Sequence, residues 1–223
     1  SARLTRLDFL SVTKYAVLFD LDGTLVDSSE SVARCWDRLA EAAGFEVGVL
    51  DELHGIPARQ FIATLLGPER ESEFDHWTAW HLKNEVEDVG GTVAYPGARA
   101  LFDWIELHPD FRWGIVTSCQ RELAVARLRE TGLPIPEVFV TFDDVTNGKP
   151  HPEPYLLGAT LMGLDSSQTF VIEDAPAGVT AGISAGAKVL AVTTTHAHGV
   201  LRHATEIVNT LEGALEYFKA NYS

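Results

Sequence analysis

The chain has 223 residues, 46% of them hydrophobic and 22% charged, which is enough apolar content to bury a core. With 17 basic and 32 acidic residues, the formal net charge is −15. That charge excludes nucleic acid and anionic membranes as expected partners, because both require a basic surface. We see no signal peptide and no apolar run near the roughly 20 residues of a membrane-spanning helix. Cys35 and Cys119 lack metal-site spacing, so we expect free thiols in a cytoplasmic protein.

The predicted elements alternate between strands and helices. Short apolar runs bounded by turn residues predict strands at Tyr15–Asp20, Trp113–Thr117, Val138–Thr141, Thr169–Glu173 and Lys188–Val192. Helical patterns lie between the later runs, at Gly97–Leu107, Arg121–Thr131, Pro154–Met162 and Ala177–Ala185. Because the runs do not alternate apolar with polar residues, both faces of the sheet should be covered. The pattern predicts an α/β fold with a doubly wound, Rossmann-like parallel sheet.

One interval, from residue 27 to residue 94, contains no predicted strand. Helical patterns fill it, at Ser29–Ala43, Pro57–Leu66 and Glu69–Asp88. Because this interval is too long for an ordinary crossover, we predict a small all-helical domain inserted after the first strand. The domains would then be a catalytic core of residues 1–26 and 95–223 and a helical insertion of residues 27–94.

Two carboxylates follow the first predicted strand. Asp20 ends the apolar run and Asp22 comes two residues later, before Gly23 and Thr24. Ligands of open α/β sheets bind outside the carboxyl ends of the strands. A carboxylate at a buried strand end is costly unless it is paired or bound to a metal. One of the two can attack a substrate while the other transfers protons or holds a metal, so we predict that Asp20 and Asp22 are catalytic.

Polar residues also follow the next predicted strands. Thr117 and Ser118 precede a helix, where hydroxyl groups and free amides can bind an anion, although Ser118 could simply cap that helix. Lys149 lies among prolines, on a stiff segment that would present its charge to a phosphate. Glu173 and Asp174 together end a buried strand, and with the first two carboxylates they form the oxygen-rich set of ligands that Mg²⁺ prefers.

In this order, the segments resemble the haloacid dehalogenase superfamily over nearly the whole chain. The residues that match its successive motifs are Asp20-x-Asp22-Gly23-Thr24, then Thr117, then Lys149, then Glu173-Asp174. The helical insertion lies where subclass I members carry a cap domain. The stretches GKPHPEPYL and VIEDAPAGVTAGISAGA resemble phosphatases of 2-deoxyglucose 6-phosphate, glycerol phosphate and related sugar phosphates.

The resemblance implies a role for each matching residue. Asp20 would attack phosphorus and form an aspartyl phosphate. Asp22 would protonate the leaving oxygen and then activate water. Thr117 and Lys149 would hold the phosphoryl oxygens. Magnesium would be bound by Asp20, by the backbone carbonyl of Asp22 and by Asp174, with Glu173 as a further ligand or as a neighbour of the ligands.

In the insertion, the segment around His54 and Gly55 resembles the loop that selects the substrate in this group. Arg59 is four residues after the glycine, whereas related enzymes often have it two or three residues after. We therefore predict substrate contacts for His54, Gly55 and Arg59, with an exposed Arg59 as the alternative.

The predicted function is a Mg²⁺-dependent phosphatase that hydrolyses a small phosphorylated sugar or polyol, in a monomer or weak dimer. Three alternatives stay open: a phosphomutase of the β-phosphoglucomutase type, a phosphoglycolate phosphatase and a non-catalytic phosphate-binding regulatory module. Dehalogenase chemistry is disfavoured because it does not need Asp22. A phosphonatase is disfavoured because its first motif has a small residue there.

Overall fold

The computed structural model describes residues 13–45 and 58–222. A six-stranded sheet forms the centre, in the order β5-β4-β1-β6-β7-β8, and every neighbouring pair in it is parallel. Its strands are β1 (Tyr15–Phe19), β4 (Phe111–Val116), β5 (Val138–Val140), β6 (Thr169–Glu173), β7 (Lys188–Val192) and β8 (Glu206–Val208). The predicted parallel α/β sheet is confirmed, and β8 extends it beyond the five predicted strands.

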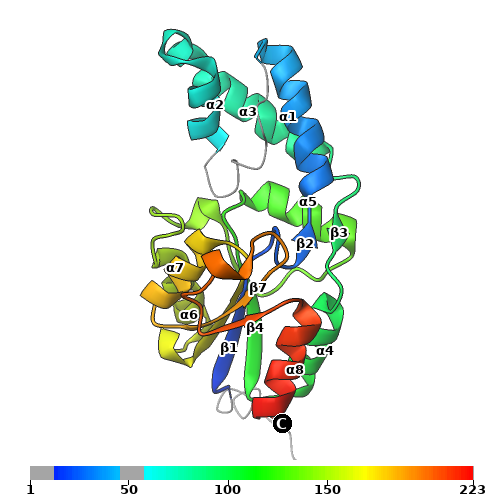
Figure 1. Cartoon of the computed structure of the whole chain (residues 1–223), viewed down its shortest axis with the longest axis vertical. Coiled ribbons are helices and arrows are strands. Elements are labelled where there is room, and N and C mark those ends of the chain that lie inside the picture. The colour runs from blue at the N-terminus through cyan, green and yellow to red at the C-terminus, as the bar shows by residue number, and fades with distance from the viewer. Residues whose placement is uncertain (1–12, 46–57, 223) are drawn as a thin grey trace, which may run out of the picture.

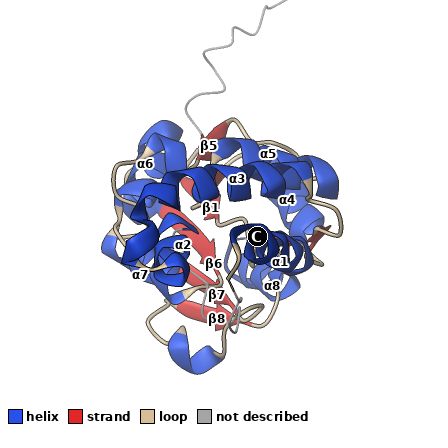
Figure 2. Ribbon diagram, turned by 90° about the horizontal axis from the view of Figure 1, so that it is seen from above, coloured by secondary structure: helices blue, strands red, loops and turns tan. Residues whose placement is uncertain are grey.

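Helices cover both faces of the sheet (Figure 2). Alternate residues of β1 point to opposite faces, with Val17 and Phe19 in one apolar cluster and Ala16 and Leu18 in another. The first cluster packs under α4 (Ala98–Leu107), α5 (Arg121–Thr131) and α8 (Leu211–Tyr222). The second packs under α6 (Glu153–Met162) and α7 (Pro176–Ser184). Burial on both faces explains why these strands have continuous apolar sequences.

Three helices lie beyond the carboxyl end of the sheet, at the top of Figure 1. They are α1 (Ser29–Ala43), α2 (Ala58–Leu66) and α3 (Phe74–Glu87). Their apolar faces form a separate small core around Trp36, Leu39, Ile62, Leu66 and Phe74. None of the helices in the described part of the chain is long and apolar enough to cross a membrane.

The sequence prediction for this region was wrong in two details. The helix expected at Glu69–Asp88 is divided into a 3₁₀ helix, η2 (Pro68–Glu73), and α3, and η2 itself is kinked at Arg70, which has non-helical backbone angles. The interval expected to contain no strand contains β3 (Val93–Ala94), which pairs antiparallel with β2 (Val26–Asp27). Strands of two residues are too short to produce a recognisable alternation. The boundaries of the proposed insertion, 27 and 94, stay a prediction.

The remaining elements are short. They are the 3₁₀ helices η3 (Phe142–Asp144), η4 (Ser166–Gln168) and η5 (His198–Val200). Both cysteines, Cys35 and Cys119, are free, as expected. A cytoplasmic location stays a prediction.

Candidate active site

Three buried carboxylates meet at the carboxyl end of the sheet. Strands β1 and β6 are neighbours, with Phe19 opposite Ile172, so the residues that follow them lie side by side. One carboxylate oxygen from each of Asp20, Glu173 and Asp174 lies within 4.8 Å of the other two. Residues separated by about 150 positions in the sequence therefore form one site, as the strand-end argument predicted.

Lys149 is the cation at the centre of this cluster. Its Nζ donates to Oδ1 of Asp20 at 2.6 Å, to Oε1 of Glu173 at 2.7 Å and to the carbonyl oxygen of Val116 at 2.9 Å. All three donors of the ammonium group are thus used. The ammonium also lies 4.9 Å from the centre of the Tyr155 ring. Lys149 is therefore in direct contact with the expected nucleophile.

Glu173 is occupied by protein groups. Its Oε1 accepts from Lys149 and, at 2.9 Å, from the hydroxyl of Tyr155. Its Oε2 accepts from the backbone amides of Asp174 and Ala175, at 3.0 and 3.1 Å. These four hydrogen bonds favour the second of its two predicted roles, in which Glu173 lies beside the metal ligands and holds Lys149 and the start of α7 in place.

Asp174 is held by two hydroxyl groups. Thr24 donates to its Oδ1 at 2.9 Å, and Thr195, in the loop after β7, donates to its Oδ2. The turn at Gly23 makes this approach possible. The φ angle of Gly23 is +85°, and a Cβ there would lie 2.2 Å from Oδ2 of Asp174. The glycine of the first motif therefore has a steric function.

The crowding of these acids has an electrostatic consequence. Burial raises the pKa of Asp20 well above its usual value, and the neighbouring Glu173 and Asp174 raise it further, against the opposing effect of Lys149. Burial and Glu173 raise the pKa of Asp174 to about 7. Within residues 13–45 and 58–222, Lys149 is the one cation that pairs with this cluster, and it contacts Asp20 and Glu173. Buried oxygen donors with excess negative charge fit a divalent cation, which favours the ionised forms.

Asp22 lies in a different environment from Asp20. Its Oδ1 accepts from the hydroxyl of Ser28 at 2.7 Å and pairs with the Arg127 guanidinium at 2.8 Å. Its Oδ2 lies 2.9 Å from the thiol of Cys119. The two aspartates that the sequence paired are thus held by separate sets of groups, as two separate chemical tasks require.

Thr117 and Ser118 follow β4 at the same edge of the sheet. Thr117 is buried, and its hydroxyl accepts from the backbone amide of Cys119 at 3.0 Å. Ser118 is exposed. The first backbone amide of α5, that of Arg121, donates to the carboxylate of Asp143 at 2.8 Å. One of the free backbone amides at the start of α5 therefore already has a protein acceptor, and Ser118 does not cap the helix.

Of the residues predicted to contact substrate from the insertion, His54 and Gly55 lie outside the described residues. Arg59 is near the start of α2, and its side chain is 57% exposed. It pairs with Asp75 at 2.7 Å and lies over the ring of Phe74. These contacts keep Arg59 within the three-helix region.

A comparison with protein families decides the assignment, because the family described as haloacid dehalogenase-like hydrolase matches residues 17–192. The chain belongs to the haloacid dehalogenase-like hydrolases. The match covers all of the strands that were predicted except the first two residues of β1, and it spans every residue of the acidic cluster.

Among hydrolases of this family, the chain is similar to two kinds of phosphatase. It is 44% identical over 180 residues to hexitol phosphatase A of Escherichia coli, covering 78% of this chain and 81% of the relative. It is 33% identical over 197 residues to glycerol-1-phosphate phosphohydrolase 2 of Saccharomyces cerevisiae, covering 83% and 77%.

The fold also matches solved structures. A hydrolase from Pseudomonas syringae superposes with a TM-score of 0.76 at 24% identity, covering 94% of this chain and all of that one. A protein from Thermotoga maritima with a provisional β-phosphoglucomutase name superposes with a TM-score of 0.70 at 27% identity, covering 93% and 99%.

Sequence reasoning missed several residues that contact this hydrolase site, notably Arg127 and Tyr155. A signal for both was present. In α5, the buried positions are Leu123, Ala124, Arg127 and Leu128, so a charged residue interrupts an apolar stripe with helical spacing. In α6, Tyr155 occupies a buried position that requires a partner for its hydroxyl group.

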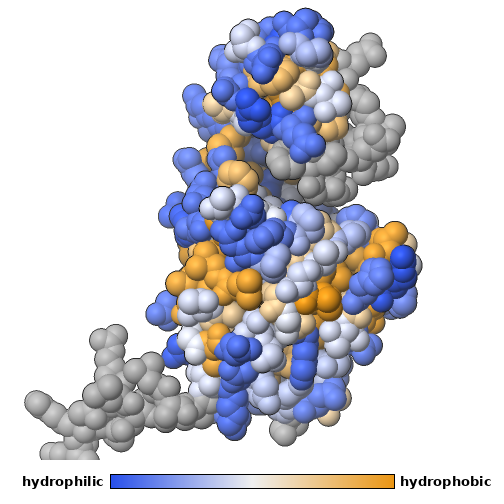
Figure 3. All heavy atoms as spheres, turned by 90° about the vertical axis from the view of Figure 1, so that its left-hand side faces the viewer, coloured by the Kyte–Doolittle hydropathy of each residue, from blue (hydrophilic) through white to orange (hydrophobic). Residues whose placement is uncertain are grey.

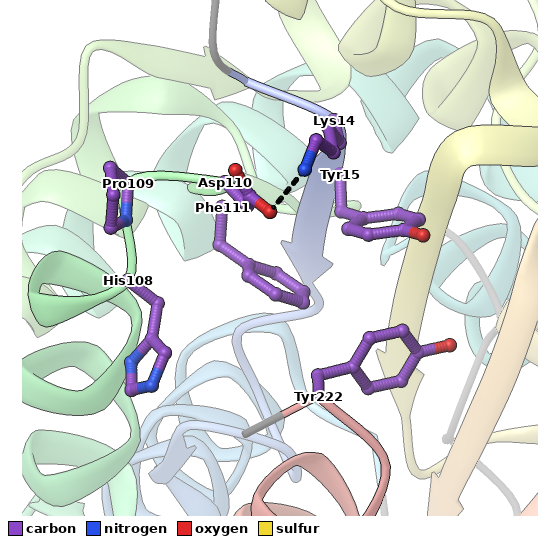
Figure 4. Close-up of a pocket in the computed structure, with 7 residues that line it drawn as sticks. All are labelled: Lys14, Tyr15, His108, Pro109, Asp110, Phe111 and Tyr222. Carbon is purple, nitrogen blue, oxygen red and sulfur yellow. Dashed lines mark hydrogen bonds and ion pairs between the residues drawn. The ribbon is translucent and has the colours of Figure 1, made fainter.

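A pocket at the opposite end of the sheet is unrelated to this site. Figure 4 shows its lining, which consists of Lys14, Tyr15, His108, Pro109, Asp110, Phe111 and Tyr222. Tyr15 and Phe111 are the first residues of β1 and β4, so the pocket lies at the amino ends of the strands. Its two charged residues, Lys14 and Asp110, form an ion pair with each other at 2.7 Å. The acidic cluster of Asp20, Glu173 and Asp174 lies at the other end.

Proposed function

We propose that this hydrolase is a Mg²⁺-dependent phosphatase that cleaves small phosphorylated sugars or polyols through an aspartyl phosphate on Asp20. The observation that carries the proposal is the set of groups at the carboxyl end of the sheet. The buried carboxylate of Asp20 contacts a lysine and lies within 4.8 Å of two further acids, and a second carboxylate follows it by two residues. Phosphoryl transfer depends mainly on such positioning and charge stabilisation.

The chemistry divides between the two aspartates. A carboxylate oxygen of Asp20 attacks phosphorus, and the bond from phosphorus to the sugar oxygen breaks. Protonated Asp22 gives its proton to that oxygen. Ionised Asp22 then takes a proton from a water molecule, whose oxygen attacks phosphorus and releases Asp20 and inorganic phosphate. Lys149 and Thr117 hold the phosphoryl oxygens.

The metal site would consist of the Asp20 and Asp174 carboxylates with the backbone carbonyl of Asp22. When bound, Mg²⁺ supplies positive charge that stabilises the phosphoryl oxygens. Glu173 supports this set by holding Lys149. The cation and Lys149 together would attract an anionic substrate to a protein whose net charge is −15.

The substrate class follows from the relatives. Hexitol phosphatase A and glycerol-1-phosphate phosphohydrolase both act, by their names, on phosphate esters of polyols. We propose the same class for this chain. Residues 27–94 would act as the cap that selects the substrate, with His54, Gly55 and Arg59 as its contacts.

A phosphomutase is the second candidate, because the Thermotoga maritima structure carries that provisional name. The two functions share the aspartyl phosphate and differ in the group that accepts the phosphoryl unit. A phosphatase gives inorganic phosphate, whereas a mutase gives an isomeric sugar phosphate. The higher identity to phosphatases favours hydrolysis.

The test is a phosphate-release assay over hexitol phosphates, glycerol phosphates and aldose phosphates with Mg²⁺. We expect release from polyol phosphates by the wild type and none by D20N, in which the amide cannot attack. Circular dichroism of D20N checks that the fold is intact. Turnover by D20N would refute the nucleophile, and formation of an isomeric sugar phosphate without phosphate release would favour the mutase.

A further inference from the structure

A buried arginine connects Asp22 to the three-helix region. Arg127 lies on α5, and its side chain is only 5% exposed. One terminal nitrogen pairs with Oδ1 of Asp22 at 2.8 Å, and the other pairs with Oε1 of Glu85, on α3, at 3.2 Å. A single guanidinium group therefore bridges the active-site loop and a helix beyond the sheet.

Glu85 depends on this arginine for its charge balance. Its side chain is 13% exposed, and burial raises its pKa. Its other neighbour is His81, whose Nε2 lies 3.5 Å from Oε2. Burial and Arg127 lower the pKa of His81 to about 4, so the imidazole is neutral at pH 7. Arg127 is thus the cation that pairs with Glu85 in the described part of the chain.

The geometry suits arginine. Burying a guanidinium group is costly, and this one has two carboxylates to compensate for it. The planar group has donors on two nitrogens that point in different directions, whereas a lysine offers one point charge. The same nitrogen that contacts Asp22 also lies 3.1 Å from the sulfur of Cys119. Together with Ser28, these contacts fix both oxygens of Asp22.

We propose that Arg127 is a positioning residue that holds the Asp22 carboxylate for proton transfer, and that Glu85 on α3 in turn fixes Arg127. This proposal rests on the proposed function, since it assigns Asp22 the transfer of protons. Arg127 itself would not contact the substrate. The position of α3 and the position of Asp22 would then be coupled through one side chain.

The kinetic test compares two leaving groups. An alkyl phosphate, such as a hexitol phosphate, needs a proton on its leaving oxygen, whereas the nitrophenolate of p-nitrophenyl phosphate leaves without one. For R127M, we expect kcat/KM to fall about 10- to 100-fold with the alkyl phosphate and by less than about threefold with p-nitrophenyl phosphate. Equal losses with both substrates, or no loss with either, would overturn the proposal.

Companion variants separate positioning from folding. R127M leaves Glu85 buried without a cation, so E85Q/R127M removes both charges and should show the same selective loss in a stable protein. E85M removes the oxygen that accepts from Arg127 and should show a smaller selective loss of kcat/KM with the alkyl phosphate. E85Q keeps an amide oxygen as acceptor, so its kcat/KM should be close to that of the wild type. R129M is the matched control, because Arg129 is an exposed arginine of the same helix. It should behave like the wild type.

A crystal structure of E85Q/R127M tests the inference without any activity. We expect the Asp22 side chain to leave its present position or to occupy several rotamers. An unchanged Asp22 would overturn the proposed role of Arg127. If the wild type releases phosphate from neither substrate, the proposed function fails. The position of Asp22 in the crystal structure of the E85Q/R127M variant then still decides whether Arg127 holds the Asp22 carboxylate.

Discussion

The position of the Asp174 carboxylate depends on an uncharged residue, Thr195. Its hydroxyl group donates to Asp174, and it comes from the loop after β7, one strand along the sheet from β6. Thr24 holds the second oxygen of the same carboxylate. Two hydroxyl groups thus orient Asp174, which we propose as a metal ligand, and their loss should change metal affinity.

We therefore expect T195V to weaken the apparent affinity for Mg²⁺ by about 10- to 100-fold, because Asp174 loses one of its two hydroxyl partners. T195S, which keeps the hydroxyl, should be close to the wild type. The measurement is phosphate release as a function of Mg²⁺ concentration. T193V changes a threonine of the same loop that contacts Asn209, and an equal effect there would argue against a specific role of Thr195.

The sequence predicted that Asp20, Glu173 and Asp174 lie together, as they do in the structure, but it missed residues that are defined by distant contacts. Asp20 and Asp174 follow the neighbouring strands β1 and β6 directly, so the topology alone brings these two carboxylates together. Lys149 comes from the loop between β5 and α6 and was predicted from its proline-rich segment. Arg127 was missed because its two partners, Asp22 and Glu85, come from other elements far away in the sequence. A buried arginine is visible as an interruption of an apolar stripe, yet the sequence does not indicate which acids compensate for it.

At the scale of elements, periodicity decided what could be predicted. The bounds of α1, α5, β6 and β7 are those expected, because long helical stripes and fully buried apolar runs are unambiguous. Strand β8 has three residues, none fully buried, and so lacks a recognisable pattern.

The first turn of α7 is packed directly against Glu173. A Cβ at Gly178 would lie 1.6 Å from Oε1 of Glu173, a carboxylate fixed by four hydrogen bonds. We expect G178A to lower the free energy of unfolding by about 1–3 kcal/mol or more, because either α7 or Glu173 must move. Urea denaturation measures this. The control is G199A, where a Cβ would meet nothing within 4 Å and the change should be small.

The packing of α3 should make stability depend on pH. Burial lowers the pKa of His81 from 6.5 to about 4. Between these values the unfolded chain binds a proton that the folded protein does not, so the contribution of His81 is present above pH 6.5 and is lost as the pH falls towards 4.

We expect wild-type stability to fall relative to H81Q by on the order of 1 kcal/mol per pH unit in this window. Urea unfolding at pH 7, 6 and 5 measures the difference. Glu85 and Asp20, whose raised pKa values act in the opposite direction, are present in both proteins. A difference that does not change with pH would contradict the prediction.

On the scale of the whole molecule, negative charge dominates. The surface seen in Figure 3 is mostly hydrophilic, and the net charge is −15. Apolar groups interrupt it on the face formed by α6 and α7, where Leu156, Leu161 and Ile183 are exposed. The buried acids at the end of the sheet add repulsion within the folded state, which a bound cation would relieve.

Stability should therefore depend on divalent cations. A cation that binds the folded protein alone stabilises it by about 2.7 kcal/mol at a concentration 100 times its Kd. We expect the Tm to rise when Mg²⁺ replaces EDTA, and D174N to lose most of that rise while being more stable than the wild type in EDTA. Differential scanning calorimetry checks both. A Tm of the wild type that is indifferent to Mg²⁺ would refute the metal site.

The short β2–β3 ribbon has an implication for evolution and for engineering. Val26 is paired with Ala94, so the chain leaves for the three-helix region and returns from it at adjacent points. A foreign helical segment of any length could be inserted between Val26 and Ala94, because the distance between its two points of attachment would stay the same. If the three-helix region selects the substrate, as we propose, chimeras of this kind would exchange selectivity while the carboxylates at the end of the sheet stay untouched.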